Sequence, residues 1–156
     1  RARPAEYVKT VTSCYDEAIH AWVEGSFSRE MLSDWDRRLA SVFNRGFWDG
    51  YYLGQRLGEW SETHGSRATF RKIYIGKGTN YFDRIGVAEV AVENDRLSIG
   101  DRILITGPTT GAMETTVTEL RVDDRPCRVA EKGKRCSLPV AEVVRRSDKV
   151  YRLVPR

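Results

Sequence analysis

The sequence predicts an α+β protein in which an N-terminal helical hairpin is followed by a small antiparallel β-barrel. Apolar residues recur at spacings of three and four before residue 43, as they do in amphipathic helices. From residue 70 they alternate with polar residues, as they do in half-buried strands. We therefore divide the chain into a helical connector over residues 1–54, a surface loop over 55–69 and a β-barrel domain over 70–156.

The two predicted helices each carry an apolar stripe. Gly25 suits the end of the first helix, and Ser28 suits the cap of the second. The stripes consist of Val8, Val11, Tyr15, Ala18, Ile19, Trp22 and Val23 in the first helix, and of Met31, Leu32, Trp35, Leu39 and Val42 in the second. Because such stripes are unfavourable in water, we expect the helices to pack on each other or on a neighbouring domain.

The second half of the chain contains segments rich in Val, Ile and Thr, which favour strands. They read FRKIYIG, RIGVAEVAVE, DRILITG, METTVTELRV and KVYRLV. Turn residues separate them at Asn94–Asp95, Gly100–Asp101, Gly107–Pro108, Asp123–Asp124 and Lys132–Gly133. Short strands joined by such turns, with no helical segment between them, indicate a closed or nearly closed antiparallel barrel.

Charge is unevenly distributed along the chain. Residues 1–66 carry 8 Lys and Arg against 10 Asp and Glu, a balance of −2, whereas residues 67–156 carry 18 against 12, a balance of +6. This excess is compatible with a polyanionic partner such as RNA, and also with simple solubility. No apolar run approaches the roughly 20 residues that span a bilayer.

The candidate RNA-binding residues are basic side chains beside the predicted turns and strand ends of the barrel. They are Lys77, Lys132, Lys134, Arg135, Arg145 and Arg146. Turns of a small barrel gather at its ends, where such side chains can contact phosphates. The alternative is a set of solvated hairpin tips.

The junction SVFNRGFWDGYYLG, residues 41–54, is unusually aromatic. Phe43 continues the apolar face of the second helix, and Asn44 suits a turn at its end. The candidate interface or stacking residues are Arg45, Phe47, Trp48, Tyr51 and Tyr52. They suit either a platform on which bases stack or a seal between packed surfaces.

Catalytic and metal-binding patterns are absent from the sequence, so we predict no catalytic residue, metal or cofactor in this chain. The string GKGTN, residues 76–80, lacks the spacing of a phosphate-binding loop and suits a strand-ending turn. Three cysteines and two histidines, Cys14, Cys127, Cys136, His20 and His64, have no zinc-site spacing. Small buried thiols in a reducing cytoplasm suit them better than a disulfide framework.

Several of these segments resemble a known family. PAEYV at 4–8, VFNRGF at 42–47 and YYLG at 51–54 resemble the C-terminal part of the bacterial collagenase-like peptidases, some of which are associated with tRNA or rRNA hydroxylation. LSIGDRILITGP at 97–108 is similar to the second-domain barrel of translation elongation factors. The resemblance implies an N-terminal catalytic domain in full-length members. In some relatives that domain holds an iron–sulfur cluster, whose ligand pattern the cysteines of this chain do not match.

The resemblance leads us to expect a non-catalytic C-terminal accessory region whose barrel positions tRNA or rRNA, or the catalytic domain of the same protein. The alternative is a protein-interaction or structural module without RNA binding. We expect a cytoplasmic protein with no membrane partner. Whether the full protein is a peptidase or acts in RNA hydroxylation stays open at this point.

Overall fold

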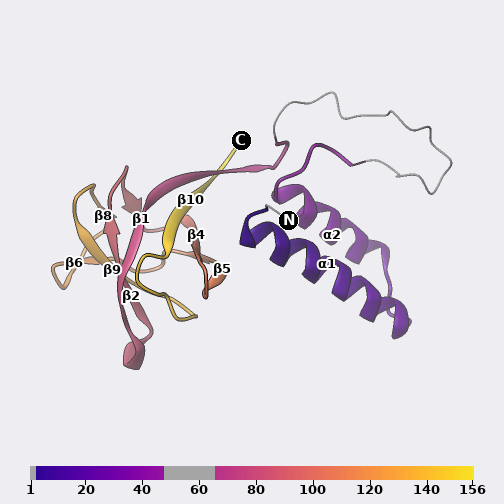
Figure 1. The fold of residues 1–156 in the computed structure, drawn as a ribbon, viewed down its shortest axis with the longest axis horizontal. Helices are drawn as coiled ribbons and strands as arrows, with labels where there is room; N and C mark the ends of the chain where they lie inside the picture. Colours follow the sequence, from indigo (N-terminus) through magenta and orange to yellow (C-terminus); the bar gives the residue numbers. More distant parts are fainter. Residues whose placement is uncertain (1–2, 48–65) are drawn as a thin grey trace. The chain divides into compact units, whose positions relative to one another are not determined.

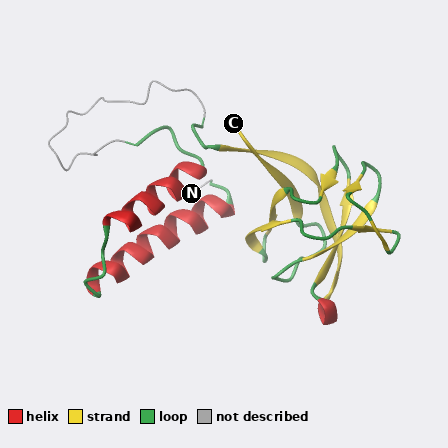
Figure 2. Cartoon of the chain, turned by 180° about the vertical axis from the view of Figure 1, so that it is seen from behind, coloured by secondary structure: helices red, strands yellow, loops and turns green. Residues whose placement is uncertain are grey.

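The structure is a computed structural model that describes residues 3–47 and 66–156 (Figure 1). The chain forms two compact units. The helical unit comprises Arg1–Phe70 together with Arg156, and the sheet unit comprises Arg71–Pro155. Figure 2 shows the long helices in the first unit, and the strands with one short helical turn in the second. The predicted α+β class, two helices followed by an antiparallel sheet, is confirmed.

The helical unit contains α1 (Ala5–Val23) and α2 (Arg29–Ser41), which begin and end near the predicted residues. Gly25, with φ of 70°, follows the end of α1, and the amide of Ser26 donates to the carbonyl oxygen of Ala21 at 2.9 Å. This is a Schellman termination, which requires a left-handed residue. The Ser28 hydroxyl accepts a hydrogen bond from the amide of Met31 at 3.3 Å and caps α2.

The side of α1 that packs on α2 differs from the predicted stripe, of which Ala18 packs against the buried cluster and most other members are exposed. Cys14 and Ala21 are buried against Trp35 of α2, and Ala18, Met31 and Leu39 pack around them. The larger side chains of the predicted stripe, including Ile19 and Trp22, are exposed. Small residues at the contact allow the two helices to approach closely, which explains why they and not the aromatic residues face α2.

A partly buried ion pair joins the two helices. Arg38 donates to both carboxylate oxygens of Glu17, at 2.5 and 2.8 Å, and the Trp35 indole N–H donates to Glu17 at 2.9 Å. Hydrogen bonding by Arg38, and secondly by Trp35, holds the pKa of Glu17 below its usual range. The same carboxylate raises the pKa of Arg38. The bidentate geometry fixes the register of α1 on α2.

We expect Glu17→Gln to destabilise the helical unit by about 0.5–1 kcal/mol at pH 7, a value reduced by the partial exposure of the pair. The folded-state pKa of Glu17 lies below the unfolded one, so the stabilisation is present above the unfolded pKa and is lost as pH falls through the folded pKa. Urea unfolding followed by circular dichroism should therefore show the difference between wild type and Glu17→Gln shrink as pH falls through the folded-state pKa of Glu17. Asp36→Asn, at an exposed position of α2, is the control. A difference between wild type and Glu17→Gln that persisted at low pH would contradict the prediction.

The sheet unit is built from antiparallel strands. Its long sheet has the order β5-β4-β10-β1-β2-β9-β6-β7, and β3 pairs with β8 separately. The strands are β1 (Phe70–Phe82), β2 (Val87–Val92), β3 (Leu97–Ser98), β4 (Arg102–Gly107), β5 (Gly111–Thr116), β6 (Arg121–Val122), β7 (Arg125–Pro126), β8 (Val129–Ala130), β9 (Arg135–Pro139) and β10 (Lys149–Pro155). A short 3₁₀ turn, Asp83–Ile85, joins β1 to β2. Closure of the sheet into a barrel stays a prediction, as does its likeness to the elongation-factor domain.

The predicted turns are present, but the assignment of one segment differs. Asp123 and Asp124 have φ of 51° and 60° and form a two-residue hairpin between β6 and β7. The GKGTN segment lies inside β1, so its interpretation as a strand-ending turn is wrong. A Cβ at Gly76 would lie 1.8 Å from the carbonyl oxygen of Ala91, so glycine here marks a close approach of two strands.

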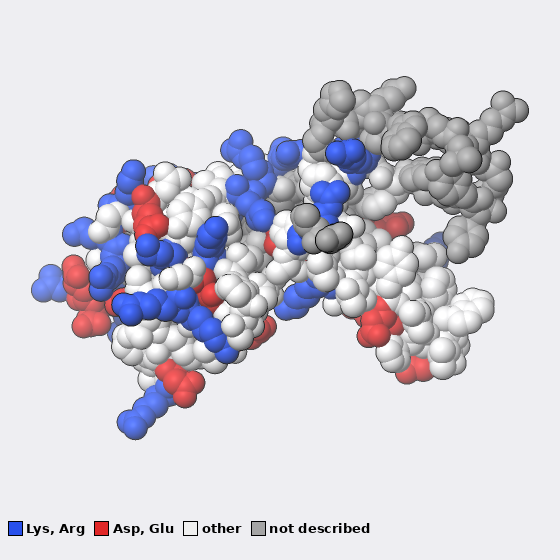
Figure 3. Space-filling model, viewed as in Figure 1, with Lys and Arg blue, Asp and Glu red and all other residues white. Residues whose placement is uncertain are grey.

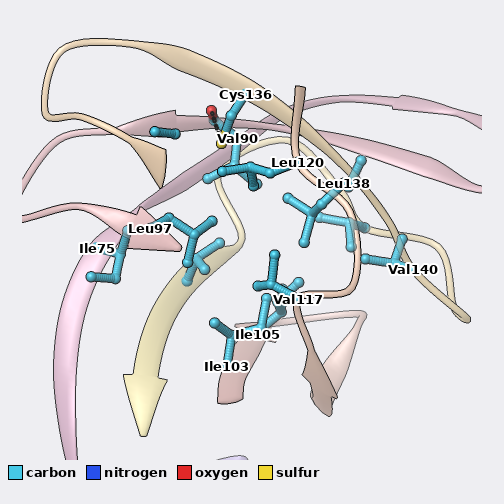
Figure 4. Packing of buried hydrophobic residues seen from close by; sticks show 14 of the residues in the cluster. Ile75, Val90, Leu97, Ile103, Ile105, Val117, Leu120, Cys136, Leu138 and Val140 are labelled. Atoms are coloured by element: carbon cyan, nitrogen blue, oxygen red, sulfur yellow. Dashed lines mark hydrogen bonds between the residues drawn. The ribbon is translucent and has the colours of Figure 1, made fainter. Parts of the chain in front are cut away.

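The core of the sheet unit is a continuous apolar cluster (Figure 4). Ile75, Leu97, Ile103 and Leu120 come from four different segments and are fully buried. Cys136 also lies in this cluster, and burial raises the pKa of its thiol to about 12. Cys14 and Cys136 are buried free thiols, as predicted, whereas Cys127 is half-buried. The core leaves the charged side chains of β1, β2 and β9 on the outer side of the sheet.

Candidate nucleic-acid interface

A β-bulge in β1 shapes the candidate site. Gly78 pairs with Val90 and Asn80 pairs with Glu89, so Thr79 is an extra residue in β1. The Thr79 hydroxyl contacts the Glu89 carboxylate and lies 3.2 Å from the Glu89 carbonyl oxygen. The bulge therefore sets Thr79 and Glu89 side by side on the outer face of the sheet.

The segment before β10 lies directly against this bulge. The amide of Ser147 donates to the carbonyl oxygen of Gly78 at 2.9 Å. The amide of Gly78 in turn donates to the carbonyl oxygen of Asp148 at 2.8 Å. A Cβ at position 78 would lie 2.8 Å from the carbonyl oxygen of Arg145, so only glycine allows this contact without a shift. These bonds hold Arg145 and Arg146 beside β1.

Asp148 fixes the conformation of that segment. Its side chain is only 2% exposed and accepts hydrogen bonds from the Thr110 hydroxyl at 2.6 Å and from the amide of Arg145 at 2.7 Å. A buried carboxylate needs such partners, because an unpaired one is very costly. Gly107 makes room for it, since a Cβ there would lie 1.7 Å from Asp148 Oδ1.

A hollow of about 670 Å³ lies between the bulge and this segment. Its lining comprises Thr79, Asn80, Tyr81, Glu89, Arg135, Val144, Arg145 and Arg146. We call it the arginine hollow. The lining contains three arginines and one carboxylate, Glu89. The Arg135–Glu89 distance of 3.9 Å makes only a loose ion pair, and the Arg145 guanidinium lies 3.4 Å from the Thr110 hydroxyl. Excess guanidinium charge with planar donors suits the binding of phosphate oxygens.

A second hollow of about 350 Å³ adjoins the first. Glu89 of the arginine hollow pairs across the sheet with Ser137, which lines the second hollow. The second hollow also contains the exposed side chains of Phe82 and Ile85, together with Val87, Glu119, Arg121, Asp124, Leu138 and Pro139. A charged hollow and a partly apolar one thus share one border on the outer face of the sheet.

Three of the six predicted RNA-binding residues meet in the structure, namely Arg135, Arg145 and Arg146. Lys77 and Arg135 belong to one row across the sheet, since both pair with Ala91. Lys77, however, forms an ion pair with Glu93 at 2.8 Å. The remaining two, Lys132 and Lys134, are exposed on the turn before β9 and do not belong to the lining of the arginine hollow.

The predicted interface or stacking residues belong to the other unit. Arg45 is exposed and Phe47 is 62% exposed in the helical unit. Trp48, Tyr51 and Tyr52 lie outside the described residues. Phe43, expected in the core, is half-buried, and its ring lies 4.0 Å from the Arg3 guanidinium.

Sequence reasoning missed the residues that organise the arginine hollow. Asp148 and Glu89 occur in charged surroundings in the sequence, and neither has a recognisable motif. The one available signal was a pair of glycines within an alternating segment, which indicates a bulge or a close backbone contact. That signal was present at Gly76 and Gly78.

The described residues supply little for other kinds of site. Over 3–47 and 66–156, no group of three or more His, Cys, Asp and Glu side chains is placed to hold a metal ion. Neither helix in that part of the chain is long and apolar enough to cross a membrane. Figure 3 shows Lys and Arg side chains gathered over the sheet unit, with acidic groups between them. The basic side chains of the sheet unit, three of which line the arginine hollow, suit an anion.

Comparisons with known proteins show which proteins the chain is similar to. Residues 1–62 match the model of peptidase family U32. A collagenase of Porphyromonas gingivalis (strain ATCC BAA-308 / W83) is 56% identical over 156 residues, which are 100% of this chain and 38% of that protein. An uncharacterized protease of Methanocaldococcus jannaschii is 35% identical, over 98% of this chain and 38% of that protein. The chain thus spans well under half the length of these curated relatives.

One solved structure is also similar to the chain. It is the C-terminal domain of a Geobacillus thermoleovorans protein described as a U32 peptidase. The match has a TM-score of 0.48 and 15% identity, and it covers 51% of this chain and 90% of that domain.

Proposed function

We propose that the sheet unit of this chain, whose residues 1–62 match the model of peptidase family U32, is a non-catalytic accessory module that binds the phosphates of tRNA or rRNA. The observation that carries the proposal is the arginine hollow. Arg135 and the pair Arg145–Arg146 come from segments on either side of β1 and line one surface depression.

The hollow is suited to an anion because its positive charge is only partly neutralised. The lining contains three arginines and one carboxylate, Glu89, which leaves an excess of two positive charges there. The segment that carries two of these arginines is fixed by the buried Asp148. Because the backbone of this segment is already fixed, less conformational entropy is lost when its arginines bind phosphate than would be lost from a freely mobile segment.

The second hollow favours a nucleic acid over a smaller anion. Phe82 and Ile85 offer exposed apolar surface next to the arginine hollow. An unstacked base can occupy such a surface while its phosphates contact the neighbouring arginines, as in single-stranded RNA recognition. A closed barrel of the elongation-factor kind, which the sequence predicts, would suit this role.

In the intact protein, this module would hold RNA near the catalytic domain of the same polypeptide. The names of the relatives, collagenase and protease, describe those proteins. Whether the whole protein cleaves peptides or modifies RNA does not affect the proposed role of the sheet unit, which needs only a phosphate-binding surface.

A filter-binding titration of the chain with bulk tRNA tests the proposal. At low salt we expect a dissociation constant of about 1–10 μM, and three phosphate contacts predict a log–log salt slope of about −2 to −3. An apolar contact with a base adds affinity that salt does not weaken. Absence of retention at low salt, or retention that does not change with salt, would contradict the proposal.

A second candidate function is the interaction module that the sequence also left open. The exposed apolar face of α1 favours a protein-interaction role for the helical unit. The two functions involve different units of the chain, so both can hold.

A further inference from the structure

The side of α1 that does not contact α2 carries large apolar residues. Val8, Tyr15, Ile19 and Trp22 are 52%, 64%, 62% and 76% exposed. They follow each other at spacings of seven, four and three, so they lie along one side of the helix. We call this set the outer face of α1. Isolated exposed apolar residues are ordinary, but a row of four on one helix marks a contact surface.

α1 is therefore apolar on two sides. One side contributes Cys14, Ala18 and Ala21 to the contact with α2, and the other is the outer face. A surface helix normally has one apolar side and an opposite polar side. A helix with two apolar sides is typical of one buried between two partners. In the described residues, α2 supplies the partner on one side only.

The helical unit has a small core of its own. The buried cluster between α1 and α2 consists of Cys14, Ala21 and Trp35. Among the described residues the helical unit thus buries little apolar area, and further apolar contact would add to its stability. The outer face offers apolar surface for that contact.

The family match identifies where the contact comes from. It covers residues 1–62 and ends inside the helical unit, whereas the sheet unit begins at Arg71. Relatives that align with the whole chain are much longer, because the chain covers 38% of each of two of them. The helices thus lie in the part of the chain that the family model matches, and the strands lie beyond that match.

We infer that α1 and α2 are the edge of the peptidase-family domain, and that the remainder of this domain covers the outer face of α1 in the intact protein. The occupant is an apolar surface of the same polypeptide, with Trp22 as the anchoring side chain. The inference goes beyond RNA binding, since it concerns the helical unit and involves none of the three arginines.

Thiol labelling tests the inference. Trp22→Cys is introduced together with Cys127→Ser, which removes the half-buried thiol. The labelling rate of the introduced thiol is then compared between residues 1–156 and the intact protein. Cys14 and Cys136 are buried and react slowly in both. We expect labelling of the introduced thiol to be at least about 30-fold slower in the intact protein, as for a buried group. Arg37→Cys, an exposed position 200° around α2 from Trp35, should be labelled equally in both.

Other results would overturn the inference. Equally fast labelling of Trp22→Cys in both proteins would mean that the outer face stays open. Slow labelling in residues 1–156 would mean that another part of the chain or, if light scattering shows a dimer, a second copy covers it. If Trp22→Cys fails to fold, the labelling rate of Ile19→Cys, on the same face, is measured instead, and the same outcomes support or overturn the inference. Loss of tRNA binding would not bear on either outcome.

Discussion

Replacement of Gly107 by alanine is expected to destabilise the sheet unit by about 3 kcal/mol or more. The added Cβ would lie 1.7 Å from Oδ1 and 2.5 Å from Cγ of Asp148. The Asp148 carboxylate cannot move away without losing its bonds to the Thr110 hydroxyl and the amide of Arg145. Each buried polar group left without its partner costs about 1–3 kcal/mol, and a charged group costs more. Hydrogen exchange at the amides of β4 and β10 measures the loss within the sheet unit.

A double-mutant cycle with Asp148→Gly separates this clash from a general effect of alanine. Asp148→Gly alone should destabilise the sheet unit because it releases the segment that carries Arg145. With the carboxylate absent, the further effect of Gly107→Ala should fall to below about 1 kcal/mol. Additive effects of the two substitutions would show that the contact between positions 107 and 148 is not the cause.

Simultaneous charge reversal at Arg135, Arg145 and Arg146 is expected to weaken tRNA binding about 100-fold or more at low salt. Each phosphate contact contributes roughly 1 kcal/mol, and three glutamates add repulsion to the loss. The log–log salt slope should approach zero, because the counterions that the arginines release are no longer displaced. Filter binding at two or more salt concentrations measures both quantities.

The matched control is charge reversal at Arg84, Arg125 and Arg128. These three side chains are exposed in the same unit, lie outside the arginine hollow, and change the net charge by the same amount. We expect the control to lose less than about threefold in affinity. If both triple variants lost affinity equally, total charge and not the hollow would govern binding, and the proposed site would be wrong.

The arginine hollow was only partly predictable. Arg145 and Arg146 were recognised as a basic pair, and Arg135 as part of another basic group. Their meeting across the bulge at Thr79 depends on the hydrogen bonds of Gly78 with Ser147 and Asp148, which lie 69 and 70 residues further along the sequence. Lys132 and Lys134, next to Arg135 in the sequence, lie outside the hollow because side chains leave a turn in different directions.

Local chemistry is what the sequence by itself determined. Ser28 and Gly25 bound the helices because capping and left-handed turns involve only neighbouring residues. Alternation and turn residues placed most strands in the same way, and family motifs indicated the relatives. Tertiary structure alone decided which face of α1 meets α2, why glycines lie inside β1, and why Asp148 is buried. Each of these depends on atoms brought together from distant segments, and their packing has no local pattern in the sequence.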